Sequence, residues 1–193
     1  MKGLLKILFV FSALFFFGCG PSDLNVQYSK SADSLSGSVN AAIQQLKAVD
    51  TVLLKKAVNR YIYYYAFIEH TVSDTLLKPE ADQLLRFMSA GKRLQDFEQN
   101  RLLLIQRGSL IATQLSNLAQ DARQQKTSAG TLKNYYVNES LEASRLLKIS
   151  QAQLSDYQSA WSDFKNALQP VEVLIRARNK GELPQVVQDS IIF

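Results

Sequence analysis

The side chains that most often carry out catalysis are scarce in this 193-residue chain, which contains one histidine and one cysteine. A serine–histidine–aspartate arrangement would have to use His70, but no nucleophile-elbow motif accompanies any serine. We interpret His70 as a helix-end or surface residue. A multi-histidine metal centre is impossible with one histidine, and a single cysteine excludes both an internal disulfide framework and a cysteine-based metal site.

Two further motifs carry residue types that occur in active sites. Ser89-Ala90-Gly91-Lys92 ends like a phosphate-binding loop, but Arg86 stands where the first glycine is required and Arg93 where Ser or Thr should follow the lysine. Glu139 and Glu142 are three residues apart, so they share one face of a helix, where carboxylate pairs are usually solvated or ion-paired. The sequence therefore predicts a protein that is not an enzyme and needs no cofactor or metal.

The most unusual group of side chains is aromatic. Residues 61–68 (YIYYYAFI) are apolar or aromatic around the whole circumference of a helix, whereas a bundle helix usually buries a stripe a little over 100° wide. One interpretation is an aromatic-rich core whose phenol hydroxyls reach water. The other is a partner or ligand surface, because Tyr is favoured at interfaces. That surface would be formed by Tyr61, Tyr63, Tyr64, Tyr65 and Phe67.

Proline positions indicate which elements hold these residues. The chain has only four prolines, at positions 21, 79, 170 and 184. Because proline disrupts a helix interior, the stretches 22–78 and 80–169 are free to form long helices. Pro79 suits the first turn of the second helix, and Thr131 suits the cap of the third. Pro170 is expected to kink or end that third helix, residues 171–178 can add two helical turns, and Asn179-Lys180-Gly181 should stop that segment.

Heptad stripes define the fold class. Apolar residues recur with spacing close to 3.5 over residues 35–53, 104–122 and 143–168. In the first half of the second helix the stripe passes through Leu84, Met88 and Gly91. The pattern predicts an all-α fold: an elongated, coiled-coil-like antiparallel bundle of three long helices over residues 35–178, with a short C-terminal extension. A coiled coil formed by dimerisation is the rival, and the oligomeric state stays open.

The first residues have the layout of an export signal. Lys2 and Lys6 precede the apolar run 7–17, which is shorter than the roughly 20 residues that a membrane-spanning helix needs. The Gly-Cys-Gly-Pro sequence at 18–21 then ends the run. Such a segment predicts a signal peptide over residues 1–18.

The cleavage region carries a second signal. Gly18 directly before Cys19 resembles the lipobox of bacterial lipoproteins, and the aromatic Phe16-Phe17 before it is similar to the relaxed lipoboxes of the Bacteroidota type. The resemblance implies cleavage before Cys19, a thioether-linked diacylglycerol on its sulfur and a fatty acid such as palmitate on its new amino group. Gly20 in place of Asp is similar to the pattern of outer-membrane lipoproteins. An uncleaved anchor that contains Cys19 is the alternative.

Lipidation would determine where the protein acts. Lipid chains on Cys19 would hold the protein at a membrane, and the Ser-rich residues 19–34 are interpreted as a lipidated tether. The basic residues are scattered along the chain, so no nucleic-acid partner is predicted. We expect a non-catalytic interaction or scaffold lipoprotein of the cell envelope, in the outer membrane, with an envelope protein as partner. The alternatives are a binding protein for a small apolar or lipidic ligand near the aromatic cluster, and a hydrolase that unites His70 with a serine and a carboxylate.

The end of the chain is unexpectedly apolar. Residues 186–193 (VVQDSIIF) contain five strongly apolar side chains, although a free terminus is usually polar and frayed. We expect the tail, residues 179–193, to fold back onto the bundle and cover part of residues 61–68. The alternative is an exposed docking peptide for another protein.

Overall fold

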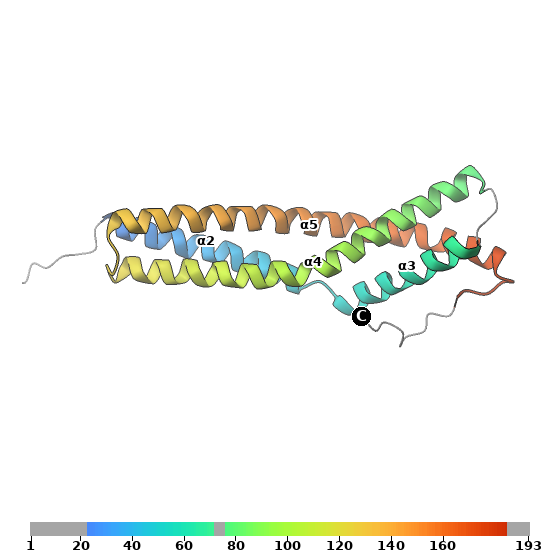
Figure 1. Ribbon diagram of the computed structural model, residues 1–193, viewed down its shortest axis with the longest axis horizontal. Helices are drawn as coiled ribbons and strands as arrows, with labels where there is room; N and C mark the ends of the chain where they lie inside the picture. The colour runs from blue at the N-terminus through green and yellow to red at the C-terminus, as the bar shows by residue number, and fades with distance from the viewer. Residues whose placement is uncertain (1–22, 72–75, 185–193) are drawn as a thin grey trace, which may run out of the picture.

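The computed structural model describes residues 23–71 and 76–184. This part of the chain forms four packed helices and no strand, so the predicted all-α class is confirmed. The helices are α2 (Asp23–Lys47), α3 (Thr51–Thr71), α4 (Lys78–Arg123) and α5 (Ala129–Arg178). Figure 1 shows an elongated molecule in which α4 and α5 form a long antiparallel pair, while α2 and α3 follow one another along it.

The first predicted long helix is two helices, which corrects the prediction of three long helices to four. The chain leaves the helix at residues 48–50, where the Asp50 carboxylate accepts hydrogen bonds from the amides of Val52 (3.0 Å) and Leu53 (2.9 Å). This side chain caps the start of α3. At the end of α2, Arg101 donates to the Leu46 carbonyl at 3.0 Å and so pairs a carbonyl that has no partner within the helix.

The prediction of a tether over residues 19–34 is wrong for its described part, which belongs to α2. The first turns of α2 bury Asn25, Ser29 and Ala32. The Ser29 hydroxyl accepts a hydrogen bond from Arg123 at 3.0 Å, so this polar side chain is paired where it is buried. A stripe of small and polar residues does not stand out in a hydropathy pattern, which is why the sequence resembled a linker.

The ends of α4 and α5 agree in part with the sequence-based expectation. Pro79 lies in the first turn of α4, and the Glu80 carboxylate accepts a hydrogen bond from the cap amide at 3.1 Å. The cap of α5 is Ser128 rather than Thr131: the Ser128 hydroxyl accepts from the Thr131 amide at 3.3 Å. Pro170 does not end α5, which continues for two further turns.

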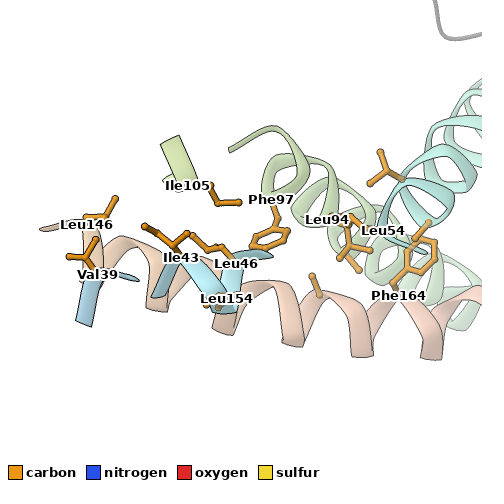
Figure 2. Packing of buried hydrophobic residues seen from close by; sticks show 14 of the residues in the cluster. Val39, Ile43, Leu46, Leu54, Leu94, Phe97, Ile105, Leu146, Leu154 and Phe164 are labelled. Carbon is orange, nitrogen blue, oxygen red and sulfur yellow. The ribbon is translucent and has the colours of Figure 1, made fainter. Parts of the chain in front are cut away.

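The core consists of two consecutive three-helix segments along the α4–α5 pair (Figure 1). The proximal segment comprises α2 with residues 101–123 and 129–155, and the distal segment comprises α3 with residues 78–100 and 156–178. The proximal core is mainly aliphatic and includes Val39, Ile43, Leu46, Ile105, Leu115, Leu146 and Leu154. The distal core holds all the aromatic side chains that are buried among the described residues: Tyr61, Tyr64, Phe87, Phe97 and Phe164. Figure 2 shows the buried side chains continuing from one segment into the other.

The C-terminal end of α5 is closed by a turn, as the sequence predicts. Lys180 and Gly181 have left-handed backbone angles (φ 51° and 90°), and the Gly181 amide donates to the Arg176 carbonyl at 2.9 Å. Leu183 packs against the core. The predicted fold-back of the tail concerns residues 185–193, which lie outside the described residues, as do the signal peptide and Cys19.

Candidate interaction surface

Helix α3 directs two of the five predicted aromatic residues into the core. Tyr64 is 2% exposed, and Tyr61 is also buried. Together with Ile68 they form an i, i+3, i+7 stripe, which is one face of a helix. Tyr61 and Tyr64 are therefore core residues and do not form a surface. The half-buried aromatic residues that pack against this core from α3 are Tyr63, Tyr65 and Phe67.

The aromatic rings form a connected set across three helices. Phe87 of α4 is fully buried at its centre. Its ring centroid lies 6.3 Å from that of Tyr61, 6.0 Å from that of Tyr64 and 5.1 Å from that of Phe164 on α5. These are favourable separations for aromatic pairs. The sequence-based stripe passed through Met88, one residue away, and so missed the central ring.

Gly91 permits the close approach of α3 to α4. A Cβ atom at this position would lie 2.2 Å from Cδ2 and 2.8 Å from Cβ of Tyr61. Any side chain at residue 91 would therefore displace the root of Tyr61, which is attached to the α3 backbone. The sequence placed this glycine in an apolar stripe and in a rejected phosphate-loop match, and neither pattern indicated its contact with Tyr61.

The Tyr64 hydroxyl connects α3 to α5. It donates to Oε1 of Glu172 at 2.9 Å, and Arg60 lies 3.8 Å from the same carboxylate oxygen. Burial, with the hydrogen bond to Glu172, raises the pKa of Tyr64 to about 12. Burial also raises the pKa of Tyr61 and of Tyr157. At neutral pH these three phenols are therefore protonated, and Tyr64 acts as a hydrogen-bond donor.

A groove of the distal segment lies on another side, between the start of α4 and the last turns of α5. This Pro170 groove has a volume of about 570 Å³. Its lining is mostly apolar with amide and carboxylate groups among it: Pro79, Glu80, Gln83, Asn166, Gln169, Pro170, Val171, Val173, Leu174 and Ala177. Val173 is 62% exposed, and the Arg178–Glu80 ion pair (3.5 Å) spans from α5 to α4 beside it.

Pro170 shapes the groove chemically as well as sterically. Proline has no N–H, so the Asn166 carbonyl lacks the donor that another residue at 170 would supply in a helix. This leaves an acceptor within the lining. The groove was not predicted from the sequence: helical turns after Pro170 were expected, but not that Val173 on those turns faces outward.

The other residues considered for chemistry are separate from this surface. His70 is exposed in the last turn of α3. Glu142 pairs with Arg107 and Arg145, and both lower its carboxyl pKa. In the described ranges, no group of His, Cys, Asp and Glu side chains could hold a metal ion. A membrane-spanning helix, long and apolar enough to cross a bilayer, is likewise not found among those residues.

Comparison with known proteins adds no relative from which a role could be transferred. No family model matches the chain, and neither the curated proteins nor the solved structures include a significant match.

Proposed function

We propose that this chain is a lipoprotein of the bacterial cell envelope and is anchored in the outer membrane through a lipid on Cys19. In this proposal it acts as a non-catalytic module that binds another envelope protein. The observation that carries the binding role is the Pro170 groove. It combines an exposed apolar side chain, Val173, with polar groups around it. An apolar centre with a polar rim is the usual composition of a protein interface.

The position of the groove supports this role. Between Ala129, at the start of α5, and Val173 the helix advances about 65 Å at 1.5 Å per residue. The start of α2 lies at the end of the bundle where α5 begins (Figure 1). A lipid attached four residues before α2 would therefore place the groove far from the anchor, where a partner in the envelope space can reach it.

The chemistry of the lining suits a polypeptide partner. The Asn166 carbonyl can accept a hydrogen bond from a partner amide, because Pro170 does not supply one. The side-chain amides of Gln83 and Gln169 can both donate and accept. A partner segment with one apolar side chain over Val173 would bury that exposed surface.

Site-specific photo-cross-linking in cells tests the partner. A photoreactive residue at Gln169, on the groove, is expected to capture one envelope protein, whereas the same residue at Ser159, exposed elsewhere on α5, is not. Val173→Glu in the Gln169-labelled chain should abolish capture, since it places a charge on the apolar contact. Equal capture at 159 and 169, or capture that survives Val173→Glu, contradicts a groove-specific partner.

The volume of the groove favours a second candidate function. About 570 Å³ is within the range of small-ligand sites, whereas the space near the aromatic cluster is occupied by packed rings. In this alternative the chain is an envelope binding protein for a small apolar or lipidic ligand. Mass spectrometry of the purified chain distinguishes the two: a co-purifying lipid that Val173→Glu removes, with no protein adduct at 169, favours the ligand.

The anchor has its own test. Cys19→Ala removes the sulfur that would carry the lipid, so the chain should remain an unprocessed precursor or be released from the membrane fraction. Processing together with retention at the membrane would contradict the lipoprotein assignment. Cys19→Ser is a suitable second variant, because serine keeps the approximate size of the cysteine side chain.

A further inference from the structure

The stretch between the proposed lipid and the folded bundle is very short. Asp23 begins α2, only four residues after Cys19 in the sequence. Four residues span at most about 14 Å when fully extended. A lipid on Cys19 would therefore keep the first turn of α2 within about 14 Å of the lipid surface.

The start of α2 is tied to the turn between α4 and α5. Arg123, the last residue of α4, lies 2.6 Å from a carboxylate oxygen of Asp33 and 3.0 Å from the Ser29 hydroxyl. The rings of Tyr28 on α2 and Tyr136 on α5 are 5.4 Å apart between centroids. Whatever holds α2 near a membrane therefore holds this whole end of the bundle there.

Several side chains exposed at this end suit a lipid headgroup layer. Leu24 is 52% exposed and Tyr135 is 55% exposed. Tyrosine is enriched at membrane–water interfaces because its ring is apolar and its hydroxyl polar. Lys126 in the α4–α5 turn and Lys133 in the first turns of α5 are exposed at the same end, and neither forms an ion pair within the described residues. Each lysine near an anionic surface is attracted to lipid phosphates.

We infer that the proximal end of the bundle contacts a phospholipid surface directly, and that the long axis of the bundle points away from this surface. The proximal end is formed by the first turns of α2, the α4–α5 turn and the first turns of α5. This inference rests on the proposed anchor at Cys19. Asp23 and Asp121 share this end with the lysines, so the contact depends on the interfacial side chains Leu24 and Tyr135 as well as on charge.

The orientation predicts how far each part of α5 lies from the membrane. Trp161 is the only tryptophan of the chain and lies about 48 Å along the helix from Ala129 at 1.5 Å per residue. Tyr135 lies about 9 Å from the same point. A quencher in the headgroup layer should reach position 135 but not position 161.

A series of single tryptophans at different positions along α5 tests the inference in the full, lipidated chain. Tyr135→Trp, Leu141→Trp and Ile149→Trp are each made with Trp161→Phe, since these three positions are exposed and tolerate a larger side chain. The chains are reconstituted in phosphatidylethanolamine–phosphatidylglycerol vesicles that carry a spin-labelled headgroup lipid. Tryptophan emission is compared with and without the spin label, and circular dichroism verifies the helix content of each variant.

The expected result is a gradient. The tryptophan at position 135 should lose most of its emission, and the tryptophan at position 141 should lose less. The tryptophan at position 149, and Trp161 in the unaltered chain, should lose none. Emission lost equally at all of these positions means that the bundle lies flat, and unquenched emission at 135 means that this end does not touch the lipid; either result overturns the inference while the anchor stands. A chain that does not float with the vesicles overturns the anchor and the inference together.

Discussion

The proximal and distal segments share α4 and α5 but differ in the third helix. In the proximal segment, α2 packs against both long helices with aliphatic side chains. In the distal segment, α3 packs mainly on α4 and approaches α5 through few residues, among them Tyr64 with its bond to Glu172. Figure 1 shows α4 diverging from α5 in this distal half. Large rings fill the wider space between the helices, and the Pro170 groove opens beside it.

Ion pairs join α4 to α5 in both segments, although the two helices diverge in the distal half (Figure 1). In the distal segment Arg93 lies 2.6 Å from Asp156 and 3.1 Å from Asp163 across the pair. In the proximal segment Arg107 pairs with Glu142 across the same two helices. Because both halves of the pair are bridged in this way, the distal segment should loosen first through α3.

Removing the central ring of the distal core should have the largest effect. Phe87→Ala deletes a fully buried ring that contacts α3 and α5, and such changes cost about 3–5 kcal/mol of unfolding free energy. Hydrogen exchange should accelerate in α3 and remain slow in α2, with the total cost measured by urea denaturation. Leu115→Ala, at a fully buried proximal position, is the matched change and should accelerate exchange in α2. Identical exchange patterns for the two variants would mean that the segments unfold as one unit.

Alkaline pH should have the second-largest effect, and it should destabilise the distal segment. The folded-state pKa of Tyr64 is about 12, above the ordinary value of 10, so its contribution to stability is complete below pH 10 and is lost as pH rises from 10 to 12. The loss is on the order of 2–3 kcal/mol, since one pKa unit corresponds to about 1.4 kcal/mol. Tyr61 and Tyr157, whose pKa values are also raised, act in the same direction.

Tyrosine absorbance and circular dichroism followed from pH 9 to pH 12 would measure this loss. Tyr64→Phe is the control, because it keeps the ring and removes the titrating hydroxyl. A stability curve that keeps its full alkaline slope in Tyr64→Phe would assign the effect to another group.

Alanine substitutions at three glycines should have the smallest effects on stability. Gly91→Ala places a Cβ against the root of Tyr61, and overpacking of this kind costs about 1–3 kcal/mol. Gly108→Ala meets the Ile43 side chain at 2.9 Å, which can move, so the gain in helix propensity of about 1 kcal/mol roughly offsets the crowding. Gly37→Ala, with nothing within 4 Å, should gain about 0.5–1 kcal/mol. Thermal denaturation ranks the three, and a Gly91→Ala chain as stable as Gly37→Ala would refute the tight α3–α4 contact.

The amino-acid sequence by itself determined the local features of this protein. The heptad spacing predicted helices and no strand, Pro79 marked the start of α4, and residues 179–181 marked the end of α5. These features could be predicted because they depend on the backbone and on side chains within a few residues. The break at Asp50 was equally local but went unnoticed, since the apolar stripe continues across it with only a change of register: Leu53 is exposed and Leu54 is buried.

Only the tertiary structure decided which residues each helix buries and where the surface opens. Ser29 is buried because Arg123, 94 residues later, provides a partner, and Phe87 rather than Met88 is central because α3 and α5 supply rings on that side. Tyr61 belongs to the core because Gly91, on another helix, makes room for it. The Pro170 groove is lined by the start of α4 and the end of α5, which are far apart in the sequence. Whether a side chain is buried depends on neighbours that are distant in the sequence. The spacing of residues within one helix therefore cannot predict it.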